Sequence, residues 1–361
     1  METQTTGAVG PENALISRGE QPLNLEMPFE SLQEFITPNE QFYVRCHFPV
    51  PKIDSETWLL RIEGAVRTPI ELTYASLREL PTHTIPATVE CAGNGRSFLE
   101  PKVKGVAWGL GAVGNAHWTG VLLRDVLERA GVDTDAREVI LEGADRGEIK
   151  ETPRPSGEIH YARSVPLEKA RRDLLLAFAM NGEPLTPEHG FPLRAVVPGW
   201  FGMAAVKWLQ RVIVTAKPFH GYYQSIDYTY WHRRGGLPNL VPLGEMQVKA
   251  QIARPRTSEV VPAGTTYRVH GAAWGGEEEV VQVEISVDGR RTWNSAALRG
   301  EAVKNAWRFW EFQWQTPSES GDRTLVARAT DAAGRAQPPQ RIADYGTYMI
   351  NHLLPIHVQV R

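Results

Sequence analysis

Residues 89–97 read VECAGNGRS, and this stretch decides how the rest of the chain is interpreted. Cys91 follows a strand-like run, residues 84–90, and a loop with two glycines comes directly after it. Glycines let a backbone approach closely, and a thiol in such a loop suits a soft metal ion. The fixed positive charge of Arg96 favours the thiolate form. The alternative is a small buried cysteine beside a turn, the commoner role of an isolated Cys.

The composition indicates a soluble globular protein with more than one core. The chain has 361 residues, of which 42% are hydrophobic and 22% are charged. This length exceeds what a single core usually serves, so we expect two domains. The net charge of -3 does not indicate nucleic acid or an anionic membrane as a partner.

Cysteine content and the N-terminal composition bear on the compartment. Cys46 and Cys91 are the two cysteines, which excludes a disulfide framework and is compatible with a reducing compartment. Residues 1–20 are polar without an apolar centre, unlike a signal peptide or an anchor. No run approaches the ~20 apolar residues of a membrane span. We therefore expect a cytoplasmic protein without a membrane partner, or a periplasmic one if an export signal has been removed.

The first two thirds of the chain predict a mixed α and β region. Residues 1–21 are typical of a flexible tail, and short helical segments then mix irregularly with strands, which favours an α+β fold over a doubly wound sheet. The expected helical segments are 32–36, 73–80 with Thr73 as N-cap, 120–130 ended by Gly131, and 166–172. The expected strands are 58–66, 84–90, 139–142, 174–180, 191–197 and 207–215, with a strand-like start to 41–51.

The pattern changes near Pro242. Short strands with period-two alternation follow, separated by turns such as Asp288-Gly289, which predicts an immunoglobulin-like antiparallel β-sandwich without a disulfide. These strands are expected at 247–252, 266–273, 280–287, 307–314, 324–330 and 355–360. We place one domain at 22–244 and the sandwich at 245–361.

Five stretches, taken together and in order, resemble the sulfite oxidase family of molybdenum enzymes. They are FYVRCHFPVP at 42–51, ECAGNGRS at 90–97, VKG at 103–105 with Trp108, HGFPLR at 189–194 and VKW at 206–208. The sandwich, including DGRRTW at 288–293, resembles the family's dimerisation domain. The resemblance implies a molybdopterin-binding domain followed by an Ig-like domain that builds a homodimer.

The resemblance also implies a role for each matching residue. Cys91 would bind molybdenum beside the two sulfurs of molybdopterin. The residues that would hold this cofactor are His47, Phe48, Pro49, Asp145, His189, Arg194, Ala205, Val206 and Lys207. The substrate side, which should be cationic for an oxyanion such as sulfite, would consist of Arg45, Arg96, Tyr228, Lys104 and Trp108.

Two positions depart from the family pattern. Cys46 stands where the family usually has Asn, and we interpret it as a small packed residue. Gly346 stands where sulfite-oxidising members carry another Arg, so a cation such as Arg233 or Arg234 replaces it or the substrate is not sulfite. The chain contains no Cys-x-x-Cys-His motif and no part resembling the cytochrome domain of animal members. We therefore expect no haem and an external electron acceptor.

Three hypotheses follow. In the first, the protein is a molybdenum oxidoreductase that oxidises sulfite to sulfate. In the second, the same cofactor acts on another S-oxoanion or reduces an S- or N-oxide. In the third, the chain is a non-catalytic binding protein that uses its sandwich, and metal analysis separates this hypothesis from the others.

Overall fold

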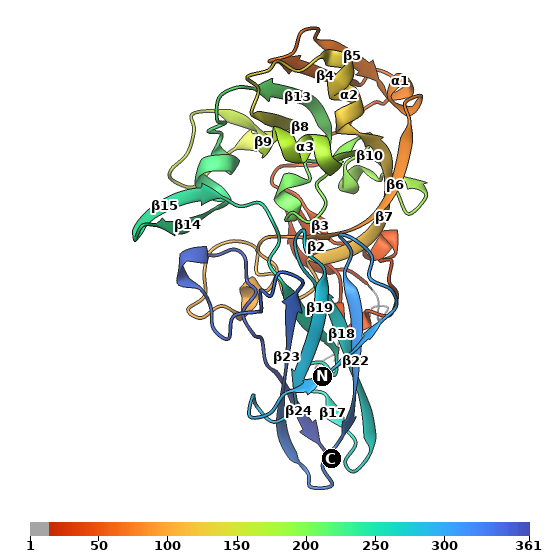
Figure 1. The fold of residues 1–361 in the computed structure, drawn as a ribbon, viewed down its shortest axis with the longest axis vertical. Coiled ribbons are helices and arrows are strands. Elements are labelled where there is room, and N and C mark those ends of the chain that lie inside the picture. Colours follow the sequence, from red (N-terminus) through yellow and green to blue (C-terminus); the bar gives the residue numbers. More distant parts are fainter. Residues whose placement is uncertain (1–13) are drawn as a thin grey trace, which may run out of the picture.

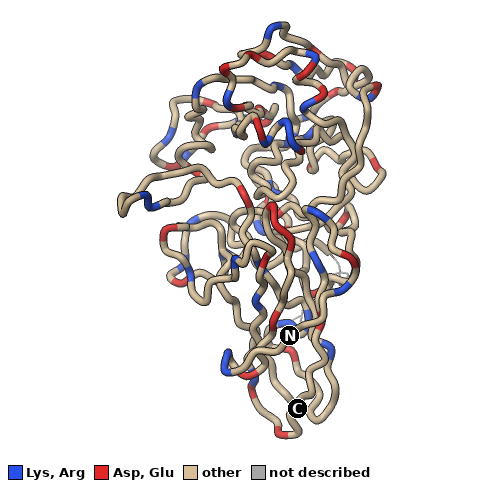
Figure 2. The backbone as a smooth tube through the Cα atoms, in the orientation of Figure 1, with Lys and Arg blue, Asp and Glu red and all other residues tan. Residues whose placement is uncertain are grey.

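The computed structural model describes residues 14–361, which form two parts that lie end to end (Figure 1). The N-terminal part combines sheets with short helices, and the C-terminal part consists of β-strands. This confirms the expected α+β class. None of the helices within residues 14–361 has the length and apolar character that crossing a bilayer requires. Figure 2 shows basic and acidic residues interspersed along both parts.

One five-stranded sheet forms the far end of the N-terminal part (Figure 1). Its strands, in spatial order, are β5 (Ile70–Thr73), β4 (Leu59–Gly64), β13 (Leu209–Thr215), β8 (Glu138–Glu148) and β9 (Glu158–Pro166). The β4–β13 pair is parallel and the other pairs are antiparallel. The fully buried side chains of Leu60, Ile62 and Val212 show that the apolar, period-two residues face the core.

A second sheet carries the Cys91 stretch. Its path runs β11 (Glu183–Pro184), β10 (Leu175–Met180), β7 (Val113–Leu122) and β6 (Thr82–Glu90), and β12 (Arg194–Val196) also pairs with β10. The turn at Asn181-Gly182 joins β10 to β11 with both residues at positive φ, as its sequence predicted. Because β6 ends at Glu90, Cys91 is the first residue beyond the strand.

Three short α-helices pack on these sheets: α1 (Tyr74–Arg78), α2 (Leu123–Ala130) and α3 (Leu167–Asp173). Thr73 caps α1 by accepting a hydrogen bond from the Ser76 amide at 3.1 Å. Gly131 ends α2 with φ at 69°, a conformation that favours glycine. Both predicted helix boundaries are thereby confirmed.

The C-terminal part is a two-layer β-sandwich. One sheet has the order β16 (Lys249–Arg254), β18 (Thr266–Trp274), β22 (Arg308–Gln315) and β21 (Ala297–Arg299). The other has the order β17 (Val260–Val261), β24 (Ile356–Val360), β23 (Gly321–Asp331), β19 (Val280–Ser286) and β20 (Asn294–Ser295). A separate apolar cluster that includes Val269, Ile285 and Leu325 fills the space between the layers.

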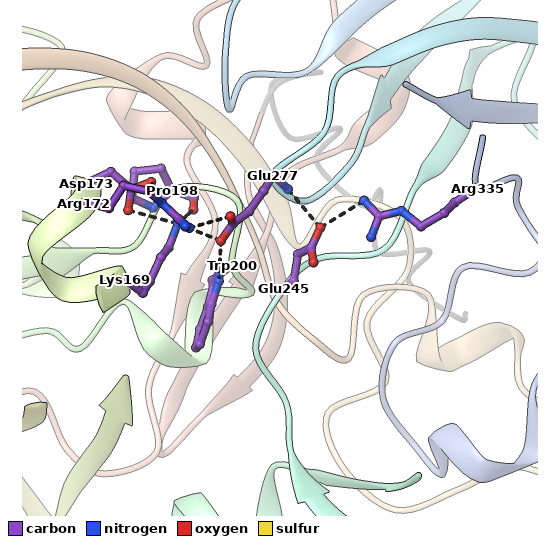
Figure 3. A network of polar contacts seen from close by, with 8 residues as sticks. All are labelled: Lys169, Arg172, Asp173, Pro198, Trp200, Glu245, Glu277 and Arg335. Atoms are coloured by element: carbon purple, nitrogen blue, oxygen red, sulfur yellow. Dashed lines mark hydrogen bonds and ion pairs between the residues drawn. The ribbon is translucent and has the colours of Figure 1, made fainter. Parts of the chain in front are cut away.

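The two parts share an apolar core and an ionic network. Trp274 and Trp307 of the sandwich belong to the same buried cluster as Phe29 and the N-terminal sheets. Figure 3 shows the ionic network, in which Glu277 of the sandwich pairs with Arg172 and, at 3.1 Å, with Lys169 of α3. Glu245, in the connection between the parts, pairs with Arg335 at 3.0 Å. The predicted boundary at 244/245 falls between β15, which ends at Pro242, and the start of β16.

Several expectations are wrong. The predicted tail, 1–21, lies in part outside the described residues, but Ile16–Glu20 forms β1, which pairs with β2 (Leu23–Glu26), and β2 pairs with β3 (Val44–Arg45). The polarity of residues 16–20 does not reveal this edge strand, because its hydrogen bonds to β2, the other arm of a hairpin, and not an apolar face make it a strand. Residues 32–36 are not helical.

The short helices of the described chain are η1 (Phe29–Ser31), η2 (Asn39–Gln41), η3 (Arg96–Phe98), η4 (Pro187–His189), η5 (Gly202–Ala204), η6 (Tyr223–Asp227) and η7 (Ala343–Tyr345).

Gly120 tests the pairing of β7 with β10. A Cβ at this position would collide with the Leu176 carbonyl group of β10. We expect Gly120→Ala to lower the free energy of unfolding by about 1–3 kcal/mol or more, since neither backbone can yield easily. Denaturant titration measures this change. The control Thr119→Ala removes a hydroxyl that bonds only to Thr84 near the surface, and it should change the same quantity by about 0.5 kcal/mol or less. Equal effects of the two variants would contradict the close approach.

Candidate active site

A cavity opens beside the Cys91 loop. Loops and strand ends from the whole N-terminal part contribute to its wall, so residues that are far apart in sequence meet there. The lining residues are Phe42, Tyr43, Arg45, His47, Cys91, Ala92, Asp145, Tyr161, His189, Arg194, Gly202, Met203, Ala205, Lys207, Trp208 and Tyr228.

Cys91 presents its thiol to this cavity and is 6% exposed. Its amide donates to the Ala112 carbonyl group at 2.8 Å, which holds the loop against β7. Burial raises the pKa of the Cys91 thiol, although Arg45 and Arg96 act in the opposite direction. The expectation that nearby arginine charge would favour the thiolate is therefore outweighed by burial. A metal ion would have to displace the proton from the sulfur.

One end of the cavity holds two buried cations. Arg194 is 5% exposed and donates only to carbonyl groups, those of His189 at 3.2 Å and Ala205 at 3.4 Å, while its Nε has no partner among the described residues. Lys207 donates to the Glu188 carbonyl group at 2.7 Å and to Cys46 Sγ at 3.3 Å. Burial lowers the pKa of Arg194 to about 10 and also lowers that of Lys207. Buried cations with neutral partners favour a bound anion such as a phosphate.

His189 and Asp145 complete this end of the cavity. Burial, with Lys207 and Arg194 nearby, lowers the pKa of His189 to about 3, so its ring is neutral. Asp145 is 3% exposed, and its Oδ1 atom lacks a partner among the described residues. Burial raises the pKa of Asp145 to about 7, despite the opposing charge of Lys207. A buried carboxyl oxygen with this freedom suits the N–H donors of a pterin ring.

Tyr228 and His47 form a direct pair at the other end. Tyr228 Oη lies 2.6 Å from His47 Nε2, and the His47 ring stacks on Tyr161 at 4.4 Å between centroids. Burial, together with the charges of Arg45, Lys207 and Arg163, lowers the pKa of His47, so its ring is neutral. In the tautomer without a proton on Nε2, this ring accepts a hydrogen bond from the Tyr228 hydroxyl group. Arg45, which lines the same cavity, donates to Asn24 Oδ1 at 3.2 Å and to the carbonyl group of Cys46.

These observations fit a molybdopterin-type group. A thiol at a strand end can ligate a soft metal, two buried cations can face a terminal phosphate, and the free oxygen of Asp145 can accept from pterin nitrogens. Cys91, Asp145, His189, Arg194, Ala205 and Lys207 line one continuous space. His47 lines it too, and its side chain is in polar contact with Tyr228.

Arg96 does not line the cavity. Its guanidinium group is buried and donates to the carbonyl groups of Thr347 at 3.1 Å and Val106 at 2.8 Å, and it lies 5.1 Å from the Tyr348 ring centroid. A Cβ at Gly93 would collide with the guanidinium group, so the glycine makes room for it. Arg96 therefore acts on the site through its charge and by holding the loop.

Other predicted site residues also stand away from the cavity wall. The side chain of Lys104 is 86% exposed and pairs with Glu151 at 3.3 Å. Trp108 is fully buried and packs edge-on against Tyr43 at 6.5 Å. Phe48 and Val206 are buried next to lining residues, and Pro49 is exposed. Backbone contacts of these three residues with a cofactor remain a prediction.

The structure adds residues that the sequence did not indicate. Tyr161 stacks on His47, and the fully buried Arg163 lies with its guanidinium carbon 5.9 Å from the Tyr228 ring centroid. Tyr348 packs on Tyr228 at 4.9 Å and donates to Asp227 at 2.7 Å. The alternation along β9 could have shown that Tyr161 and Arg163 share a face. No local pattern could have placed Tyr348, which comes from the sandwich.

Comparison with known proteins agrees with this site. Residues 47–223 match an oxidoreductase molybdopterin-binding domain, and residues 241–361 match a Mo-co oxidoreductase dimerisation domain. The chain belongs to the sulfite oxidase family. Mitochondrial sulfite oxidase from Mus musculus is 37% identical over 90% of this chain and 61% of its own length. Nitrate reductase [NADH] 2 from Phaseolus vulgaris is 33% identical over 90% of this chain and 39% of its own length.

A solved structure shares the fold. The crystal structure of the sulfane dehydrogenase SoxCD from Paracoccus pantotrophus superposes with a TM-score of 0.79 and 26% identity, covering 98% of this chain and 86% of that chain. This member of the sulfite oxidase family thus shares its two-part architecture with that structure. The chain spans about 61% of the length of the mouse relative.

Asp145 predicts a pH-dependent stability in the cofactor-free protein. Its pKa in the folded state, about 7, exceeds the ordinary value of 3.8, so the stability it contributes is full at acidic pH and is lost as the pH rises to about 7. Asp145→Asn stays neutral throughout. We expect the free energy of unfolding of Asp145→Asn minus that of the wild type to increase by a few kcal/mol from about pH 4 to pH 8. The reason is that one unit of pKa shift is worth about 1.4 kcal/mol.

Denaturant titrations over this pH range measure the difference. The exposed Asp135→Asn serves as the matched control, and its profile should follow the wild type. A flat difference between the wild type and Asp145→Asn would show that the carboxyl group is ionised in the folded protein at all of these pH values.

Proposed function

We propose that this family member oxidises sulfite to sulfate and passes the electrons to an external acceptor. The balanced half-reaction is SO₃²⁻ + H₂O → SO₄²⁻ + 2 H⁺ + 2 e⁻. The observation that supports it most is a single cavity that combines the Cys91 thiol, the Arg45 guanidinium group and the Tyr228–His47 pair. The same cavity argues against the non-catalytic hypothesis, because burying cations without an anionic ligand is costly.

Cys91 would ligate the molybdenum, and Arg194, Lys207, His189 and Asp145 would hold the pterin and its phosphate. When bound, the cofactor supplies oxygen-atom transfer and takes up two electrons. The neutral His189 ring and the guanidinium fork of Arg194 offer hydrogen bonds to the phosphate end. These residues would hold the group in the same cavity that Arg45 lines.

Arg45 binds and orients the oxyanion. Its guanidinium group donates to Asn24 and to the Cys46 carbonyl group through one nitrogen, so other N–H groups are free to bind an anion. Arg45 lines the cavity together with Tyr228. Holding the anion in one orientation lowers the entropic cost of the reaction, and fixed positive charge stabilises the dianionic product.

Tyr228 and His47 handle protons. The Tyr228 hydroxyl lies 2.6 Å from His47 Nε2 and donates to it when the neutral His47 ring carries its proton on Nδ1, and both residues line the cavity. As water supplies the oxygen atom of sulfate, a proton released in the cavity can pass to Tyr228 Oη while the Tyr228 proton passes to His47 Nε2. Burial disfavours a charged His47, so the proton moves on when the anion leaves.

Two partner assignments belong to the same proposal. The sandwich matches a dimerisation domain, which supports a homodimer, and sedimentation of a monomer alone would contradict it. The proposed electron acceptor is external, a protein or a small oxidant, because the sequence carries no Cys-x-x-Cys-His motif for a covalent haem.

A second candidate keeps the cofactor and changes the substrate. Gly346 is exposed at φ of 60°, and Arg233, one suggested replacement for the missing Arg, pairs with Asp344 at 2.7 Å outside the cavity. Tyr348 instead approaches Tyr228, so an aromatic ring stands on the substrate side where a cation was expected. The similarity to a sulfane dehydrogenase and a nitrate reductase is compatible with this candidate. A molybdenum-replete sample that fails to reduce ferricyanide with sulfite would favour it.

Cys91→Ser tests the proposed ligand. Replacing the thiolate by a weak alkoxide donor should lower the rate of sulfite oxidation about 100-fold or more, because the soft metal loses its sulfur ligand from the protein. Molybdenum content by mass spectrometry and ferricyanide-linked turnover are the measurements. The control Cys46→Ser changes the other buried thiol, and it should keep the turnover. Full activity in Cys91→Ser would refute the assignment.

Arg45→Met tests the anion site. Loss of a charge-assisted hydrogen bond, worth about 1.5–3 kcal/mol, should lower kcat/KM for sulfite about 10- to 150-fold with molybdenum content unchanged. Lys104→Met and Arg233→Met are matched controls, since both cations are exposed and ion-paired outside the cavity. Similar losses in all three variants would point to general steering by surface charge and against a specific role of Arg45.

A further inference from the structure

The Cys91 stretch is held by the sandwich at every second residue. The Thr88 hydroxyl accepts from the Trp307 amide at 2.7 Å, and the Ala92 carbonyl group accepts from the Met349 amide at 2.9 Å. Arg96 donates to the Thr347 carbonyl group at 3.1 Å. Side chains alternate along β6, so Thr88 and Glu90 share the face toward the sandwich and Val89 lies on the opposite face. The chain turns directly after Cys91, where the next contacts with the sandwich follow. Cys91 itself faces the cavity.

The centre of this arrangement is a buried ion pair across the two parts. Glu90 of β6 and Lys249 of β16 lie 2.9 Å apart, and their side chains are 3% and 2% exposed. Trp274 Nε1 donates to the other Glu90 oxygen at 2.9 Å. Asn94 donates to Glu90 at 3.0 Å and accepts from Lys249 through its carbonyl oxygen at 3.3 Å. Both carboxylate oxygens of Glu90 and the ammonium group of Lys249 therefore have partners. Two of the residues involved, Glu90 and Asn94, lie before and after Cys91 in the chain.

We propose that Lys249 and Glu90 are positioning residues for the Cys91 ligand, so that the sandwich is part of the cofactor site. The inference rests on the proposed function, because it presumes that Cys91 binds metal. A carboxylate bonded from three directions has one orientation, and Cys91 follows it directly in the chain. A buried ion pair adds little net stability compared with apolar packing, but it can fix a geometry.

The ionic network in Figure 3 shows why simple attachment does not explain this pair. Glu277 already joins the sandwich to Lys169 and Arg172, and it does so at a distance along the chain from the Cys91 loop. The shared apolar core around Trp274 and Trp307 adds further attachment. The Glu90–Lys249 pair differs from these contacts because Glu90 is the residue directly before Cys91 in the chain.

The test separates positioning from folding. Lys249→Met alone leaves a buried carboxylate without its cation, which can unfold the protein. The double variant Glu90→Leu with Lys249→Met replaces the pair by apolar side chains of similar size. Its melting temperature should fall less than that of Lys249→Met, although Trp274 Nε1 and Asn94 Nδ2 lose their acceptor. Arg172→Ala, which removes a contact between the two parts in Figure 3, is the matched control.

Two readouts are independent of sulfite turnover. In the cofactor-free full-length chain, the rate of Cys91 alkylation by iodoacetamide is followed by peptide mass spectrometry, which separates Cys91 from Cys46. We expect this rate to rise about tenfold or more in the double variant, since the loop opens locally, and to stay at the wild-type value in Arg172→Ala. In the molybdenum-loaded protein, the thiolate-to-metal absorption band should shift in the double variant and not in the control.

An unchanged alkylation rate in a folded double variant, or an equal rise in Arg172→Ala, would overturn the proposal. Failure of the proposed function has a different signature, namely a wild-type protein that lacks molybdenum and does not oxidise sulfite. In that case the alkylation readout still decides whether the sandwich positions the Cys91 thiol.

Discussion

Buried positive charge is the constraint on which the rest of the site depends. Arg194 and Lys207 lie in a closed part of the cavity, and their hydrogen bonds go to carbonyl groups and one sulfur atom. The one carboxylate on the wall formed by described residues, Asp145, has a raised pKa and neutralises them poorly. Such charges are costly to bury without an anion, so the cavity is built to receive one. A phosphate-bearing cofactor meets this requirement, and it leaves Arg45 for a second, smaller anion.

The same burial sets the protonation state of the remaining groups. Loss of water keeps the Cys91 thiol protonated and both His47 and His189 neutral. A neutral His47 can accept from Tyr228, and a protonated thiol awaits a metal ion to become a ligand. The thiol and the two histidines of the cavity are therefore uncharged until a ligand brings charge into it. Binding of that ligand is then accompanied by proton movement over short distances between neighbouring groups.

The two-part architecture connects this chemistry to the fold. Strand β6 belongs to the N-terminal sheet through β7, and yet its end is bonded to the sandwich through Thr88 and Glu90. The loop that carries Cys91 is thus held from both sides. The sandwich also supplies Tyr348, which packs on the cavity residue Tyr228. A change in the sandwich can alter the site without touching the cofactor-holding residues.

The sequence by itself determined the local features, because these depend on neighbours along the chain. Thr73 and Gly131 marked helix ends, period-two alternation marked most sandwich strands, and a glycine loop after a strand marked Cys91. The family resemblance named the residues of the cofactor pocket, and most of them line one cavity. Strand β1 was missed, since its partner strand and not its own polarity makes it a strand.

Only the tertiary structure decided the directions of the side chains. Arg96 donates to a carbonyl group 251 residues away, Lys104 lies in solvent, and His47 contacts Tyr228. Burial and long-range hydrogen bonds set these directions, and both come from segments that are distant in sequence. Residue type and spacing thus determined which chemistry is available, whereas packing decided which of these groups reach the cavity.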